Sequence, residues 1–103
     1  MKQYTTPTIT ITIEGASEIL ANAERVIVTF ARNRYLYDLD GIVDGDTVTV
    51  SLTQEQTATL KGSVQVEVSV VAKNDDGSLN VIKSETMTME VEPSIKQEII
   101  EDE

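Results

Sequence analysis

The chain has 103 residues, enough for one domain that buries roughly 65% of the surface its unfolded form exposes. Hydrophobic residues make up 40% of the chain and charged residues 25%, as in soluble globular proteins. Cysteine and histidine are both absent, which excludes disulfides, thiolate nucleophiles, imidazole bases and most transition-metal sites. We therefore expect a protein that is not an enzyme and that binds no cofactor.

The charge balance is strongly acidic, because 18 acidic and 8 basic residues give a formal net charge of −10 at pH 7. Phosphate backbones and anionic lipids repel such a chain, so we expect neither nucleic acid nor a membrane as its partner. Apart from a group at 98–103, the acidic residues are scattered along the chain, which favours a role in solubility. A DNA-mimic inhibitor with its carboxylates on one face is a less favoured alternative.

Alternation of residue types predicts most of the elements in the first half of the chain. Residues 8–13 alternate threonine with isoleucine, a period of two that is typical of a strand with its isoleucines inward. Residues 18–24 are too few for an independent helix, so we expect one helical turn or an irregular crossover there. Further strands are expected at 35–39 and 46–52, with a short extended piece at 42–43.

The segment 25–32 predicts a strand that is apolar on both faces. Val28 and Phe30 share one face, whereas Ile27 lies on the other. Such a strand is typical of the centre of a sandwich or of a surface that meets a partner. The side chains that we expect to contribute to a protein interface come from this strand and the next: Val26, Ile27, Val28, Phe30, Tyr35 and Tyr37.

The second half of the chain begins with a helical turn and continues with long strands. Thr53 and Gln56 have the spacing of a capping box, which predicts a helical turn that stops before Gly62. Residues 63–73 form the longest predicted strand. The alternation of residues 79–91 slips by one position, and a β-bulge near residues 83–85 would reconcile its two halves.

Short strands separated by turn residues are typical of an all-β sandwich. We predict an immunoglobulin-like β-sandwich of about seven strands with one short helical turn, its core built from valine, isoleucine and leucine. The label refers to architecture only, because the disulfide and tryptophan of antibody domains are missing. The expected division is a sandwich domain at 1–93 and an acidic C-terminal tail at 94–103.

Three groups of polar or aromatic residues are candidate ligand sites. The aspartate-rich segment 38–46 fails the pattern of a calcium-binding loop, and turn chemistry explains its Asp-Gly pairs, so we predict no metal site. Arg25, Arg32 and Arg34 are expected to be solvated or ion-paired. Tyr35 and Tyr37 share a strand face and would form a sugar-stacking surface, although half-buried sheet positions are the more common role of such residues.

Four stretches, with the most distinctive parts at 52–57 (LTQEQT) and 62–68 (GSVQVEV), carry a resemblance to a phage family. The stretches are Thr10–Gly15, Ala23–Phe30, Asp44–Thr57 and Lys61–Val68. They resemble the small β-sandwich proteins encoded beside tail-fibre genes in phages of Gram-positive gut bacteria. The chain is also similar to the N-terminal domain of the upper baseplate protein of siphophages, over roughly residues 8–91.

The resemblance implies a virion structural protein of the tail or baseplate that acts through contacts with other virion proteins or with copies of itself. Residues 1–7 contain no apolar segment of a signal peptide, so we expect synthesis in the bacterial cytoplasm and a place in the virion after assembly. The alternative from another functional class is a carbohydrate-binding or adhesin-like sandwich in which Tyr35 and Tyr37 contact the glycan.

Overall fold

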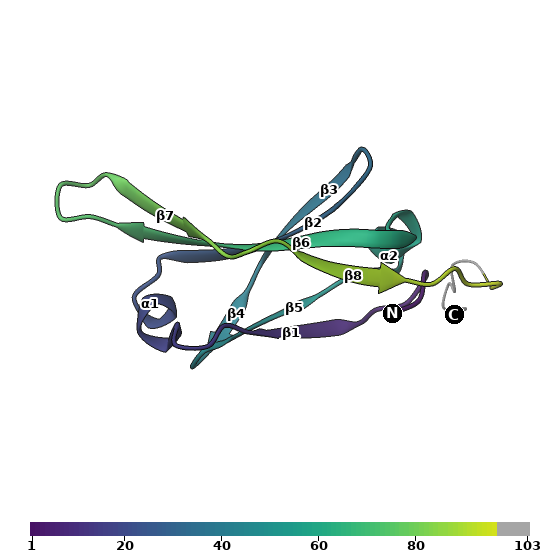
Figure 1. Cartoon of the computed structure of the whole chain (residues 1–103), viewed down its shortest axis with the longest axis horizontal. Coiled ribbons are helices and arrows are strands. Elements are labelled where there is room, and N and C mark those ends of the chain that lie inside the picture. The colour runs from purple at the N-terminus through teal and green to yellow at the C-terminus, as the bar shows by residue number, and fades with distance from the viewer. Residues whose placement is uncertain (97–103) are drawn as a thin grey trace, which may run out of the picture.

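The computed structural model describes residues 1–96 and confirms the expected all-β sandwich (Figure 1). Two antiparallel sheets face each other, and the described part of the chain has eight strands and two short helices rather than about seven strands and one helical turn. Most of the expected C-terminal tail, from residue 97 onward, lies outside the described residues. The elements in chain order are β1 (Thr8–Thr12), α1 (Ser17–Ala21), β2 (Arg25–Arg32), β3 (Tyr35–Asp40), β4 (Ile42–Asp44), β5 (Thr47–Ser51), α2 (Gln54–Thr59), β6 (Gly62–Lys73), β7 (Leu79–Lys83) and β8 (Met87–Val91).

The larger sheet is built around the long strand β6. Strand β2 pairs with one side of β6, and β3 pairs with β2 as the outermost strand. The other side of β6 is shared: β8 pairs with residues 62–66 and β7 pairs with residues 69–73. The smaller sheet has the order β1-β5-β4.

The core lies between the two sheets and follows the period of two in each strand. Alternate residues of β2 and β6 point inward, so that Val28, Phe30, Val64 and Val68 are completely buried. Strand β5 supplies the opposing layer, with Val48 also completely buried. The isoleucines of the N-terminal strand are half-buried and pack against this core, as their alternation with threonine predicts.

The chain passes from the larger to the smaller sheet at Gly41, between β3 and β4. The Gly41 N–H donates to the carbonyl of Val26 over 2.8 Å, so the corner stays joined to the larger sheet. A Cβ atom at Gly41 would overlap Cγ1 of Val48, which is a core side chain. Only glycine therefore fits where the chain changes sheets.

Helix α2 closes one end of the sandwich and begins with the predicted capping box. Thr53 Oγ1 accepts from the Gln56 N–H over 3.1 Å, and the Thr53 N–H donates to Gln56 Oε1 over 3.0 Å. Two orphan donors at the helix start are thereby satisfied. The buried hydroxyl of Thr57 accepts from the Thr5 N–H over 3.1 Å and lies 2.9 Å from the Thr5 carbonyl, which joins the N-terminal segment to the helix.

Candidate interaction surface

The hairpin formed by β6 and β7 projects from the body of the sandwich. Figure 1 shows it reaching past α1, on the side away from the N-terminus, with no strand of the smaller sheet beneath its tip. Every residue of β7 is exposed, and its large apolar side chains are no exception: Leu79 is 61% exposed, Val81 49% and Ile82 42%. Apolar side chains so gathered on a soluble protein mark an interaction site more often than scattered ones do.

Both faces of this hairpin are apolar. Leu79 and Val81 lie on the outer face, where Val81 is directly opposite Val71 of β6. Ile82 lies on the inner face opposite Val70, and with Ile19 of the α1 region it lines a shallow groove of about 160 Å³. A partner that meets the hairpin would therefore find apolar contacts on either side of the same strand.

The predicted β-bulge is present and separates β7 from β8. Two residues of β6 lie between the pairs Val66–Met87 and Ser69–Lys83, whereas three residues of the opposite segment lie between them. The extra residue restores the inward face of β8, with Met87, Met89 and Val91 against or within the core. This confirms the bulge that the slipped alternation predicts.

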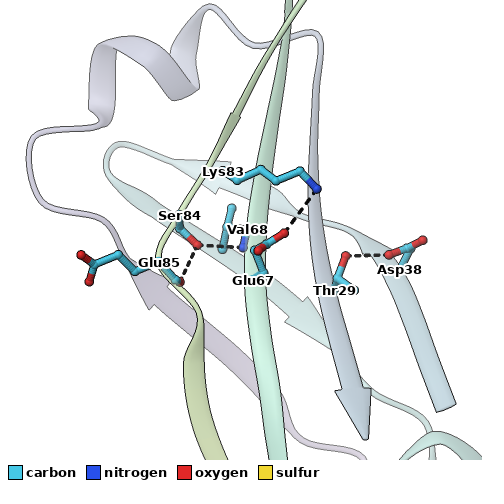
Figure 2. A network of polar contacts seen from close by, with 7 residues as sticks. All are labelled: Thr29, Asp38, Glu67, Val68, Lys83, Ser84 and Glu85. Atoms are coloured by element: carbon cyan, nitrogen blue, oxygen red, sulfur yellow. Dashed lines mark hydrogen bonds and ion pairs between the residues drawn. The ribbon is translucent and has the colours of Figure 1, made fainter. Parts of the chain in front are cut away.

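Ser84 completes the hydrogen bonding of the bulge with its side chain (Figure 2). Its N–H donates to the Val68 carbonyl over 2.9 Å, and its hydroxyl oxygen accepts from the Val68 N–H over 2.9 Å. The same hydroxyl donates to the Glu85 carbonyl over 3.0 Å. The hydroxyl thus takes the place of the carbonyl acceptor that a regular ladder would offer to Val68.

Replacing Ser84 by alanine is expected to lower the free energy of unfolding by about 1–2 kcal/mol, because the Val68 N–H loses its acceptor in a partly buried position. Urea unfolding followed by circular dichroism measures this loss. Hydrogen exchange should also become faster at the Val68 amide. The variant Ser84→Thr keeps the hydroxyl and is the matched control. Unchanged stability and unchanged exchange in Ser84→Ala would show that the hydroxyl does not support the bulge.

The charges around the outer face of the hairpin are paired with one another. Figure 2 shows the Lys83 side chain crossing β6, and its Nζ lies 3.3 Å from a carboxylate oxygen of Glu67. The Nζ of Lys73 lies 4.0 Å from a carboxylate oxygen of Glu24. These pairs are exposed and contribute little to stability. Their effect here is to leave the strands of the hairpin close to neutral within an acidic protein.

The tip of the hairpin is a tight polar loop at residues 74–78. The Asp76 carboxylate accepts from the hydroxyl of Ser78 over 2.6 Å and from its N–H over 2.9 Å. The side-chain bond and then the backbone bond to Ser78 lower the pKa of Asp76 from its usual value. With Asp75 beside it, the tip is acidic at neutral pH.

The structure corrects the expected interface on β2. Val26, Val28 and Phe30 are 5%, 0% and 0% exposed, because the smaller sheet covers the face of β2 that carries them. They are core residues and offer nothing to a partner of the folded protein. Ile27 lies on the outer face between Ser69 and Asp40 and is half-buried.

The two tyrosines of β3 also face inward. Tyr35 and Tyr37 pack against the core, and the Tyr37 hydroxyl lies 2.6 Å from that of Thr59 in helix α2. They do not form the exposed platform that a sugar ring needs. Strand β7, like β2, has apolar residues at both parities. The criterion that predicts an interface on β2 therefore also predicts one on the hairpin.

Local contacts explain the remaining polar groups that the sequence singles out. Arg25 Nε lies 2.8 Å from Asp40 Oδ1, and Arg34 lies over the ring of Tyr35 at 5.6 Å from its centroid. Asp38 accepts from the Thr29 hydroxyl over 2.6 Å. In the aspartate-rich segment, Gly45 has a φ of +62°, as its turn requires.

Three further findings bear on the class of protein. Among residues 1–96, no helix has the length and apolar character needed to cross a membrane. The same residues contain no group of three or more acidic side chains arranged to hold a metal ion. Comparison of the chain with protein-family models, curated proteins and solved structures gives no match.

Proposed function

We propose that this chain is a non-enzymatic structural module of a phage or prophage tail, and that it acts through protein contacts made by the β6–β7 hairpin. The observation that carries the proposal is the edge strand β7, in which every residue is exposed and Leu79, Val81 and Ile82 are apolar. Burial of these side chains against protein removes apolar surface from water, which favours association.

The placement in a phage tail rests on the resemblance of the four stretches between residues 10 and 68. These stretches contain all of β5, most of β1, β2 and α2, and the first half of β6. The hairpin tip and β7 follow the last of these stretches and lie within the resembling region, which ends at about residue 91.

The alternative of a glycan-binding sandwich receives less support, because its contact residues Tyr35 and Tyr37 are packed against the core. Leu36 is the exposed apolar residue of that strand, at 61%, and a lone aliphatic side chain provides no ring for stacking on a sugar.

The tail assignment is tested on particles from the strain that encodes the chain. Phage particles are induced, purified on a density gradient and analysed by mass spectrometry, and an antibody against the chain is used for electron microscopy. We expect the chain at a fixed ratio to the tail proteins, with label confined to the tail. Purified, infectious particles that lack the chain would overturn the assignment.

A further inference from the structure

Strand β7 is the least protected edge of the larger sheet, and its large apolar side chains are exposed. Edge strands expose unpaired backbone groups, and proteins shield them with charges, bulges, proline or short length. Strand β3, the opposite edge of the larger sheet, carries Asp38 and Asp40. The neighbouring half of the same edge, β8, is set apart by the bulge, from which Glu85 points away from β6 (Figure 2). Strand β7 has five residues, no proline and a single charged residue, Lys83.

The hydrogen bonds at both ends of β7 show which of its backbone groups are free. The Ser84 N–H donates to Val68, and at the other end the Ser78 carbonyl accepts from the Asn74 N–H. In an antiparallel ladder alternate residues face the partner strand, so Asn80 and Ile82 also face β6. The N–H and carbonyl groups that point away from the sheet are those of Leu79, Val81 and Lys83.

We infer that two copies of this chain pair through β7, antiparallel, about a two-fold axis at Val81, so that the two larger sheets become one continuous sheet. This inference names the partner for the contact strand of the proposed function, and to that extent it rests on it. Val81 lies opposite its counterpart, and Leu79 lies opposite the second copy's Lys83. Each of these pairs exchanges two backbone hydrogen bonds, as in any antiparallel ladder.

The charge pattern of the hairpin fits a second copy in this arrangement. The only charge on β7 is Lys83, and the two-fold axis places the two lysines at opposite ends of the joint strands. Each lysine then lies toward the acidic tip of the other copy, where Asp75 and Asp76 are, while the two tips stay apart. The centre of the joint is apolar on its outer face, with valine against valine, and such self-complementarity is what a two-fold interface requires.

The position of the hairpin gives a second copy access. It projects beyond α1, so two sandwiches that meet along β7 approach each other through their hairpins and not through their strongly acidic bodies (Figure 1). The inner-face groove beside Ile19 and Ile82 also stays next to the joint, where Asn80 of the second copy would cover Ile82.

Single-cysteine variants test the register directly, because the natural chain has no cysteine. In a hydrogen-bonded antiparallel pair the Cα atoms are about 5.5 Å apart, which a disulfide spans. Val81→Cys should therefore cross-link to its own copy under mild oxidation. Leu79→Cys is the matched control: residue 79 lies on the same face and is more exposed than residue 81, but its counterpart is four residues away, about 13 Å along the strand. We expect cross-linking at least tenfold faster for Val81→Cys.

Association of the cysteine-free protein gives the second readout. Analytical ultracentrifugation should show a concentration-dependent dimer, and Val81→Lys should raise its Kd at least tenfold, because two like charges then meet at the axis. Thr12→Lys makes the same charge change at an exposed position on the other sheet and should leave the Kd unchanged. Circular dichroism checks that both variants fold.

Three results would overturn the inference: a monomer at every concentration up to about 1 mM, equal cross-linking of the two cysteine variants, or equal Kd values for the two lysine variants. Its failure differs from failure of the proposed function. A chain that is monomeric in solution and present in purified tails refutes the two-fold pairing alone. A chain that dimerises through β7 and is absent from the particles refutes the tail assignment alone.

Discussion

Phe30→Ala is expected to lower the free energy of unfolding by about 3–5 kcal/mol, a large part of the roughly 5–15 kcal/mol that stabilises a domain of this kind. Phe30 is the only phenylalanine of the chain and is completely buried. It lies at the middle of the larger sheet, with Tyr37 on one neighbouring strand and Val66 on the other. Its truncation leaves a cavity that the surrounding valines are too short to fill.

Urea unfolding measures the effect, and Leu36→Ala is the matched control. Leu36 lies on the adjacent strand and is 61% exposed, so its truncation to alanine should change the free energy of unfolding by less than about 0.5 kcal/mol. The comparison also separates a core role of Phe30 from an interface role. Equal and small losses of unfolding free energy for the two variants, with weaker self-association for Phe30→Ala, would instead indicate that Phe30 contributes to an interface and not to the core.

Gly41→Ala is expected to destabilise the fold by about 1–3 kcal/mol or more, because its new Cβ atom overlaps the Val48 side chain inside the core. The corner cannot move outward without loss of the hydrogen bond from Gly41 to the Val26 carbonyl. Val48→Ala by itself opens a cavity and costs about 2 kcal/mol. Each substitution alone lowers the free energy of unfolding. In combination, Val48→Ala removes the atom that the new Cβ overlaps, and this Cβ fills part of the cavity.

A double-mutant cycle makes this interaction visible. Gly41→Ala combined with Val48→Ala should be less destabilised than the sum of the single variants, by at least about 1 kcal/mol. Gly41→Ala combined with Val50→Ala is the matched control, since Val50 is a core residue of the same strand and supplies none of the three atoms nearest to a Cβ at residue 41. Additive losses in both cycles would contradict the overlap with Val48.

Alternation, turn residues and capping motifs predict most of the strands and helices. They do not predict which faces are buried, because burial depends on pairing between distant segments. Strand β2 has the predicted bounds, Arg25–Arg32, because β-branched residues and flanking turn residues determine it. The capping box at Thr53 is equally local. Which face of β2 the smaller sheet covers depends on the order of all strands, and no periodicity within β2 carries that information.

The region around the contact strand shows the same limit. A slip in alternation is enough to predict the bulge, since one extra residue must reverse the inward face. It does not predict that the Ser84 hydroxyl replaces a carbonyl, or that β7 lies beyond the cover of the smaller sheet. Exposure of β7 follows from its place at the edge of the larger sheet, where it pairs with β6 alone, and residues 72–73 of β6 extend past β2.

The pairing of the N-terminal segment with Glu92 determines on which side of the molecule a fused or bound protein would lie. The Gln3 N–H donates to the Glu92 carbonyl over 2.8 Å, and the Glu92 N–H donates to the Met1 carbonyl over 2.7 Å. Residue 1 and residue 92 are therefore neighbours, at the opposite end of the molecule from the hairpin (Figure 1). A protein joined to the chain near either residue would lie at the opposite end of the molecule from β7 and would leave β7 accessible.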